Sequence, residues 1–380
     1  MTDPSKLGVY IHWPYCARIC PYCDFNVFKD RAGQAHDLLV RAILTDLRAQ
    51  AALTGTKELV SIFFGGGTPS LMDPDWSAEI IATARELWTS APDLEITLEA
   101  NPTDAETDRF AAFAEAGVNR LSLGVQALQD EALRFLGRNH DAAGAVRALE
   151  AAAGAFPRLS IDLIYGRPNQ TPASWARELS TAIEFGPEHI SPYQLSIEAG
   201  TAFDRAVRRG AFAPPDADLG AALFETTQAV LETAGFEAYE VSNHAKGSGA
   251  RARHNLIYWQ GQDYVGVGPG AHGRVTLAGV RHATHAASKP ADYMARVDET
   301  GLGYAAAEAL SARETAEERL LSGLRITDGV AMSELEALHI APQRIADLVG
   351  LGLLADDPAR LRATKAGRLV LDRLTGDLAT

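Results

Sequence analysis

The chain has 380 residues, of which 47% are hydrophobic and 22% charged, a composition that excludes a disordered or fibrous protein. Its formal net charge of −14 disfavours a nucleic-acid partner, which would need a basic face on the protein. Three cysteines are too few for a disulfide framework. No leader peptide or integral membrane segment is predicted, so we expect a cytoplasmic protein.

Short apolar runs alternate with Ala-rich helical segments through the first 200 residues. The predicted strands are residues 7–13, 59–64, 94–98, 120–125, 159–165 and 190–195. The predicted helices are residues 35–51, 76–88, 104–116, 142–153 and 172–185. Continuous Val, Ile and Leu strands that alternate with helices predict an α/β fold with parallel strands. Six such units favour a partial (β/α)6 barrel, with an open doubly wound sheet as the alternative.

The pattern changes after about residue 200. A helix that starts with proline is predicted over residues 214–234, and a segment rich in Gly, Tyr, Asn and His follows it. Helices and a small hairpin in residues 304–375 resemble a winged-helix module, which the acidic balance favours as structural. We predict a core barrel over 1–235, a segment over 236–300 that packs on it, and a winged-helix-like α+β domain over 301–380.

All three cysteines lie in one loop directly after the first predicted strand, as Cys16, Cys20 and Cys23. Three thiolates at the carboxyl end of a barrel strand can hold three irons of a [4Fe–4S] cluster. The fourth iron then stays open to a small molecule. A zinc site with His12 as its fourth ligand is an alternative, and so is a redox pair of Cys20 and Cys23.

The Cys-x3-Cys-x2-Cys spacing, with Tyr22 before the last cysteine, resembles the signature of the radical S-adenosylmethionine (SAM) superfamily. A Gly-Gly-Gly-Thr-Pro motif after the second predicted strand supports the resemblance, although a triple glycine alone also fits a tight turn. The resemblance implies a [4Fe–4S] cluster on the three cysteines and SAM on the open iron. It also implies that Gly66, Gly67 and Thr68 line the SAM methionine moiety.

Further motifs, at residues 9–14, 99–102, 123–126, 136–140 and 161–166, resemble oxygen-independent coproporphyrinogen III dehydrogenases and their haem-chaperone relatives. The dehydrogenases carry a fourth cysteine where this chain has Phe25, and a longer N-terminal arm. The chaperones carry the motif His-Asn-x-x-Tyr-Trp, which is present here at residues 254–259. The resemblance leaves enzymatic activity open and favours a chaperone over the dehydrogenase or another radical SAM enzyme.

The resemblance assigns SAM contacts beyond the cysteine loop and the glycine turn. Glu99 can accept hydrogen bonds from a ribose or an ammonium group, or it is an acid at a helix start. Arg138 can also form a surface salt bridge, and Asp162 can also cap a turn or orient Arg138. The positions that match SAM contacts are Tyr10, Tyr22, Gln126, Arg138, Asp162 and Ser196.

His254 is the expected haem contact, as an exposed imidazole flanked by Tyr258 and Trp259, although a histidine is also often a structural hydrogen-bonding residue. His272 is expected either to close over SAM or only to pack. The implied function is to bind haem transiently and to hand it to client haem proteins such as respiratory-chain enzymes. Membrane contact is expected only through these clients, and a homodimer is left open.

Overall fold

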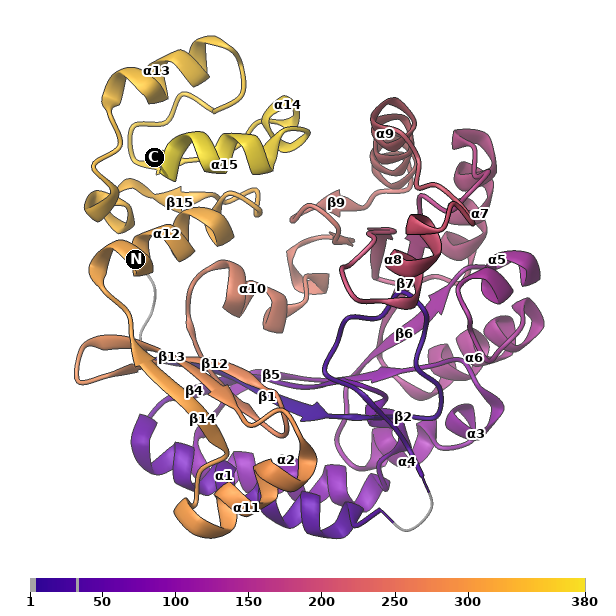
Figure 1. Ribbon diagram of the computed structural model, residues 1–380, viewed down its shortest axis with the longest axis vertical. Helices are drawn as coiled ribbons and strands as arrows, with labels where there is room; N and C mark the ends of the chain where they lie inside the picture. The colour runs from indigo at the N-terminus through magenta and orange to yellow at the C-terminus, as the bar shows by residue number, and fades with distance from the viewer. Residues whose placement is uncertain (1–4, 32–33, 380) are drawn as a thin grey trace.

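The computed structural model describes residues 5–31 and 34–379, and one curved sheet of twelve strands organises most of them (Figure 1). Seven neighbouring strands, from β11 to β8, run parallel, and antiparallel strands extend both edges. The strand order starts at β14 and ends at β9, so the barrel is open. In this order the strands are β14 (Tyr304–Ala309), β13 (Val280–Ala286), β12 (His272–Leu277), β11 (Asp263–Val267), β1 (Lys6–Trp13), β4 (Glu58–Gly66), β5 (Thr89–Ala100), β6 (Arg120–Gln126), β7 (Arg158–Tyr165), β8 (His189–Gln194), β10 (His244–Ala245) and β9 (Glu237–Ala238).

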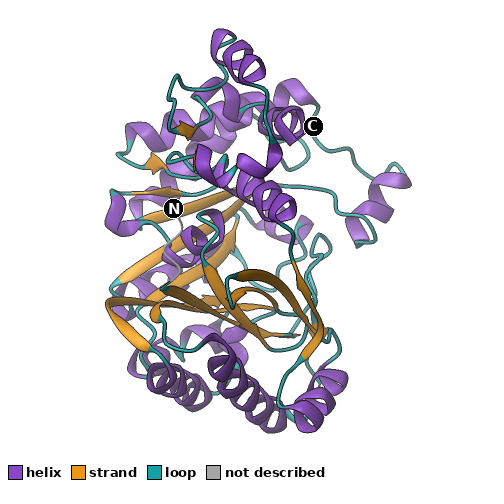
Figure 2. Cartoon of the chain, turned by 90° about the vertical axis from the view of Figure 1, so that its left-hand side faces the viewer, coloured by secondary structure: helices purple, strands orange, loops and turns teal. Residues whose placement is uncertain are grey.

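Helices cover the convex face of this sheet. Figure 2 shows the sheet as a curved wall of strands with a layer of helices below it. The helices that follow the strands are α1 (His36–Thr54), α2 (Pro74–Leu87), α3 (Asp104–Thr107), α4 (Phe110–Glu115), α5 (Asp130–Phe135), α6 (Ala142–Ala155), α7 (Pro172–Glu184), α8 (Ala202–Arg208), α9 (Ala217–Thr233) and α11 (Pro290–Thr300). The predicted partial parallel barrel of an α/β protein is therefore confirmed. The predicted helix over 104–116 consists of two short helices, α3 and α4.

Side chains along the parallel strands alternate between an apolar outer face and a polar inner face. On β6, for example, Leu121 and Leu123 are fully buried in the core under the helices, whereas Ser122 lines an internal cavity. The Val, Ile and Leu residues of these strands therefore lie mainly on the outer face. A period of two places every second residue on the concave side of the sheet, and polar side chains there leave room for a ligand.

The helix after residue 210 begins later than its prolines predict. The side chain of Asp216 accepts a hydrogen bond from the backbone N–H of Leu219, so Asp216 is the N-cap and α9 starts at Ala217. Pro214 and Pro215 precede the cap. The expectation that a proline starts this helix is therefore wrong.

Helix α10 (Arg253–Trp259) carries the His-Asn-x-x-Tyr-Trp motif and lies on the concave side of the sheet (Figure 1). Its start is fixed by Glu95 of β5, whose Oε1 accepts a hydrogen bond from the backbone N–H of Arg253 at 2.9 Å. The side chain of Ile257 is buried between α10 and the sheet. This arrangement brings the motif close to the first strands of the barrel.

The chain after residue 310 builds a second apolar core, which includes Leu320, Leu354 and Leu374. Its elements are α12 (Ala312–Gly323), β15 (Val330–Ala331), α13 (Pro342–Gly350), β16 (Arg360–Leu361), α14 (Lys365–Arg368) and α15 (Leu371–Ala379). Strands β15 and β16 pair antiparallel although α13 lies between them in sequence. Leu354 also pairs antiparallel with Ala363, in the segment where the sequence predicts the small hairpin. Figure 1 places these elements above the open side of the barrel.

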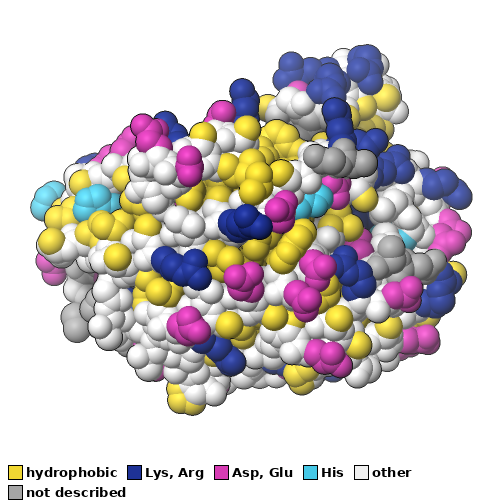
Figure 3. All heavy atoms as spheres, turned by 90° about the horizontal axis from the view of Figure 1, so that it is seen from below, with side chains coloured by type: hydrophobic (Ala, Val, Ile, Leu, Met, Phe, Trp, Pro, Cys, Tyr) yellow, Lys and Arg dark blue, Asp and Glu magenta, His cyan; other side chains and the backbone are white. Residues whose placement is uncertain are grey.

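The outer surface below the sheet mixes acidic, basic and apolar side chains (Figure 3). Helices α1, α2 and α11 lie on this side of the molecule in Figure 1. Within the described residues, no helix has the length and apolar character that crossing a bilayer requires.

Candidate functional site

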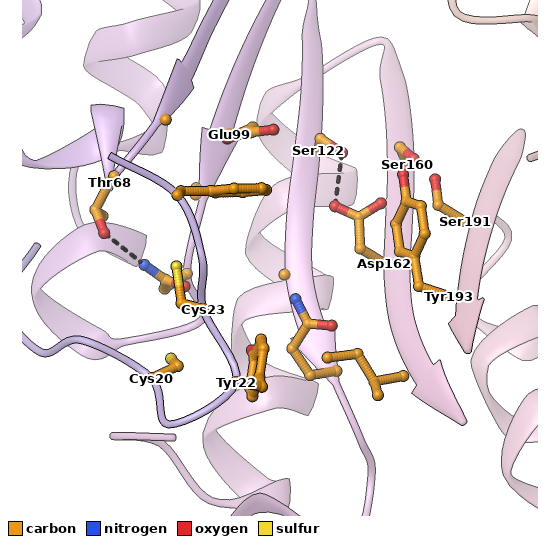
Figure 4. Close-up of a pocket in the computed structure, with 18 of the residues that line it drawn as sticks. Cys20, Tyr22, Cys23, Thr68, Glu99, Ser122, Ser160, Asp162, Ser191 and Tyr193 are labelled. Carbon is orange, nitrogen blue, oxygen red and sulfur yellow. Dashed lines mark hydrogen bonds between the residues drawn. The ribbon is translucent and has the colours of Figure 1, made fainter. Parts of the chain in front are cut away.

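A cavity of about 500 Å³ lies at the carboxyl ends of the parallel strands (Figure 4). It collects most of the residues that the sequence singled out. Those that line it are Cys16, Cys20, Tyr22, Cys23, Gly66, Gly67, Thr68, Glu99, Gln126, Arg138, Asp162 and Ser196. The sequence predicts a site at the carboxyl ends of the strands, where active sites of parallel barrels usually lie, and the cavity is found there.

The three cysteines enter the cavity from the loop that follows β1. Cys16 belongs to β2 (Tyr15–Cys16), which pairs with β3 (Phe28–Lys29), and the N–H of Cys23 donates to the carbonyl of Cys20 at 3.1 Å. All three thiols are free. Burial raises the pKa of Cys16 to about 11 and also raises that of Cys23. Without a bound metal the thiols of Cys16 and Cys23 are therefore protonated, and metal binding at them must release these protons.

No three His, Cys, Asp or Glu side chains in the described part of the chain are placed to hold a single metal ion. Assigning Cys16, Cys20 and Cys23 as cluster ligands therefore depends on their common cavity and on thiolate chemistry. The zinc alternative required His12 as a fourth ligand. Its Nε2 lies 2.9 Å from the carbonyl oxygen of Asn26, and its Nδ1 lies 3.0 Å from the hydroxyl of Tyr10.

The glycine turn at the end of β4 lies against the chain that enters the cysteine loop. Gly66 has φ of 104°, and a Cβ at Gly67 would lie 2.6 Å from the carbonyl oxygen of Tyr15. The N–H groups of Gly67 and Thr68 donate to the carbonyls of Trp13 and Tyr15 at 2.7 and 2.8 Å. Glycine is thus required here by close backbone packing, and the two motifs form one structural unit.

Arg138 connects the cysteine loop to the ends of β5 and β6. Its Nη1 donates to the Sγ of Cys20 and to the hydroxyl of Tyr22, both at 3.3 Å. Its Nη2 donates to the carbonyl of Gly124 at 3.0 Å and to the side chain of Asn101. Arg138 is therefore a cavity residue, and the alternative of a surface salt bridge is wrong.

Two carboxyl groups line the cavity on either side of β6. Glu99 comes from β5 and Asp162 from β7 (Figure 4). Burial, followed by the charge of Asp162, raises the pKa of Glu99 to about 8. Burial also raises the pKa of Asp162, whose Oδ2 accepts from Ser122 at 2.8 Å. Asp162 is therefore bonded to a serine of β6, which disagrees with the alternative that it orients Arg138.

Gln126 offers an unpartnered polar atom to this cavity. Its backbone has φ of 66°, in the left-handed region that non-glycine residues rarely adopt. Its buried Oε1 has no hydrogen-bond partner among the described residues. A buried acceptor without a partner costs free energy, so a donor group of a bound ligand would stabilise it.

Two of the predicted site residues lie outside this cavity. Tyr10 lines a second cavity instead, and its hydroxyl lies near the ring of His12. His254 is only 1% exposed, with Nδ1 2.9 Å from the hydroxyl of Ser61 and Nε2 2.6 Å from the hydroxyl of Tyr258. The expectation of an exposed imidazole at position 254 is therefore wrong, because both ring nitrogens are engaged inside the protein.

Several polar residues of the cavity were not predicted from the sequence. Asn101, at the end of β5, donates to Thr68 Oγ1 at 3.1 Å and accepts from Arg138. Asn101 lies in the motif at residues 99–102, so the sequence contained a pattern from which it could have been predicted. Serines of the inner sheet face carry no such signal, because serine is common in strands and loops alike. Figure 4 shows these at Ser122, Ser160 and Ser191.

Two family patterns and several full-length relatives match this chain. The pattern of the Radical SAM superfamily matches residues 10–181, and that of the HemN C-terminal domain matches residues 310–370. The mitochondrial radical S-adenosyl methionine domain-containing protein 1 of Mus musculus is 40% identical over 97% of this chain and 86% of its own. The heme chaperone HemW of Mycobacterium tuberculosis is 36% identical over 98% of this chain and 95% of its own.

A solved structure shows the same fold. Coproporphyrinogen III oxidase (HemN) from Escherichia coli superposes with a TM-score of 0.82, covering 99% of this chain and 90% of its own, at 23% identity. At that identity the likeness concerns the fold alone. The level of identity to the HemW sequence, over nearly its whole length, is what identifies the family. The chain therefore belongs to the radical SAM superfamily and, within it, to the HemW family of haem chaperones.

Proposed function

We propose that this protein binds haem transiently and delivers it to client haem proteins, with respiratory-chain enzymes as the clients. Membership of the radical SAM superfamily implies a [4Fe–4S] cluster and SAM. The first cavity fits both groups, because it presents three free thiols, a glycine turn and the unpartnered acceptor of Gln126. Cys16, Cys20 and Cys23 would hold the cluster, which supplies one-electron chemistry or a binding site for SAM.

The position of helix α10 is the observation that carries the proposal. It places Tyr258 and Trp259 in the wall of a second cavity, of about 700 Å³, beside the cysteine loop. Flat aromatic side chains bury a flat macrocycle well. Phe25, which is 62% exposed, lines both cavities. A haem in the second cavity would therefore lie next to the loop that holds the cluster.

His254 acts in this proposal as a positioning residue. Its ring stacks on Phe63 with centroids 4.8 Å apart, and its Nε2 contacts the hydroxyl of Tyr258. These contacts tie α10 to the inner face of β4. The histidine of the motif would thus hold the aromatic wall in place.

Position 25 bears on the alternative, a coproporphyrinogen III dehydrogenase. This chain has Phe25 where the resemblance places a fourth cysteine in the dehydrogenases. An apolar side chain there offers neither a proton nor a metal ligand to a substrate. We therefore expect no oxidative decarboxylation of coproporphyrinogen III.

One preparation of the anaerobically reconstituted protein tests both functions. It is titrated with haem while difference absorbance is recorded, and the same sample is incubated with coproporphyrinogen III, SAM and a reductant. The proposal predicts saturable, near-stoichiometric haem binding without formation of protoporphyrinogen IX. Absence of saturable haem binding would contradict the chaperone, and SAM-dependent product formation would establish the dehydrogenase instead.

A further inference from the structure

The second cavity contains a pair of histidines that the haem-chaperone motif does not include. Its lining residues come from α10, from strands β12 and β13, from α12 and from the end of the cysteine loop. His272 on β12 and His285 on β13 are direct partners in the antiparallel register and both line the cavity. Their rings stack with centroids 4.2 Å apart and planes 12° apart.

The imidazole of His272 is available to a ligand. The residue is exposed, and neither its ring nor that of His285 makes a hydrogen bond to another described residue. An imidazole nitrogen without a hydrogen-bond partner can ligate a metal. This contrasts with His254, whose two nitrogens already have partners.

Arginines share this face of the two strands, because residues two apart on a strand point the same way. Arg274 follows His272 on β12, and its guanidinium is held by Glu318 with Nε–Oε1 2.8 Å. Arg281 precedes His285 on β13 and donates to the carbonyl of Gly261 at 2.9 Å. Its buried Nε has no hydrogen-bond partner in the described part of the chain.

Two carboxylates form ion pairs with Arg281 but accept no hydrogen bond from these nitrogens. Asp263 lies 3.6 Å from its Nη1 and Glu318 lies 3.7 Å from its Nε, and both distances are too long for a hydrogen bond. A planar guanidinium matches the geometry of a carboxylate. The indole N–H of Trp259, which also lines the cavity, is likewise buried without a hydrogen-bond partner among the described residues. The cavity therefore presents a metal ligand, unpartnered donors and aromatic rings to one ligand.

We propose that the haem of the proposed function binds in this second cavity, with His272 as an axial ligand of its iron. His285 backs the His272 ring by stacking, and Arg281 faces a propionate carboxylate. A flat, anionic, iron-containing macrocycle is the ligand class that combines these three features. The inference rests on the proposed function and adds the site and the iron ligand.

Three alanine variants and the unchanged protein, each titrated with ferric haem, test this assignment. His272→Ala is expected to weaken haem binding at least about tenfold and to remove the spectral signature of imidazole ligation, since a lost metal–ligand bond exceeds the roughly 1.4 kcal/mol of a tenfold change. His282→Ala is the matched control, because His282 is on the same strand β13 but does not line the cavity. It should bind haem like the unchanged protein.

The third variant, His254→Ala, and a rescue experiment separate ligation from folding. Free imidazole should restore ligation to His272→Gly, which a protein that fails to fold would not show. If His254→Ala loses the imidazole signature while His272→Ala keeps it, the assignment of His272 is overturned and haem binding stands. If the unchanged protein binds no haem, the proposed function itself fails.

Discussion

Arg138 Nη1 lies 3.3 Å from Cys20 Sγ, although 118 positions separate the two residues in sequence. The same guanidinium also donates to the carbonyl of Gly124, at the carboxyl end of β6. A fixed positive charge therefore contacts a sulfur of the cysteine loop from the barrel wall. A cation beside a thiolate stabilises its charge, so this contact supports the shape of the loop and would stabilise a thiolate at Cys20.

Replacing Arg138 by alanine is expected to weaken retention of the cluster. The loop would lose its hydrogen bonds to the barrel, and Cys20 would lose a neighbouring positive charge. Iron and acid-labile sulfide per chain, measured after exposure to a chelator, should fall severalfold faster than in the unchanged protein. Arg134→Ala is the control, because Arg134 is exposed on α5. Equal cluster loss in both variants would contradict the anchoring role.

SAM binding is expected to strengthen as pH rises through about 8, the pKa to which burial raises Glu99. Below that pH the Glu99 carboxyl is protonated before SAM binds, and it must release its proton to pair with a cationic ligand. The affinity should therefore fall by up to about tenfold per pH unit on the acidic side. Calorimetric titration of the reconstituted protein with SAM measures it. Glu99→Gln should flatten the profile, and an unchanged slope would assign the proton elsewhere.

The buried imidazole of His254 is expected to make the fold less stable in acid. Burial lowers the pKa of His254 from 6.5 to about 3, so the unfolded chain binds this proton at a higher pH than the folded chain does. The stability is complete above about pH 6.5 and falls, by about 1.4 kcal/mol per pH unit for one proton, as pH decreases towards 3. Urea unfolding of the apo-protein is measured across this pH range. On unfolding, the His254→Gln variant should take up one proton fewer than the unchanged protein. An equal uptake would show that His254 does not carry this dependence.

Gly67→Ala is expected to destabilise the protein and to disturb the cysteine loop. The added methyl group would lie 2.6 Å from the carbonyl oxygen of Tyr15, where backbone must move. Overpacking of this kind costs about 1–3 kcal/mol, measurable as a lower unfolding midpoint and a lower iron content. Gly154→Ala on α6 is the control, since nothing lies within 4 Å of its Cβ position. A destabilisation by Gly154→Ala equal to that by Gly67→Ala would contradict the steric account.

The strands and outer helices were predictable because each contributes apolar residues to one core. Val9 and Ile11 of β1, like Ile96 and Leu98 of β5, are fully buried under the helices. Strand β11 was not predicted, because Asp263–Val267 is short and the chain on both sides of it is rich in glycine and glutamine. It is placed in the sheet by its antiparallel pairing with β12 and by its parallel pairing with β1, which is a contact between opposite ends of the chain.

The site was predictable where its residues are close in sequence. The cysteine loop and the glycine turn are local motifs, and both line the first cavity. The environment of His254 was not, because its partner Ser61 is 193 positions away on β4. The pairing of His272 with His285 likewise depends on the register of two antiparallel strands. Local patterns predict which residues carry chemistry, whereas burial depends on the whole fold.

Haem delivery is the most direct test of the account. Membranes that contain a haem-deficient respiratory enzyme are incubated with the haem-loaded protein, with an equal amount of free haem, or with the haem-free protein. The account predicts that enzyme activity recovers faster and further with the loaded protein than with free haem, while the haem-free protein restores nothing. Recovery no better than with free haem would contradict a chaperone function.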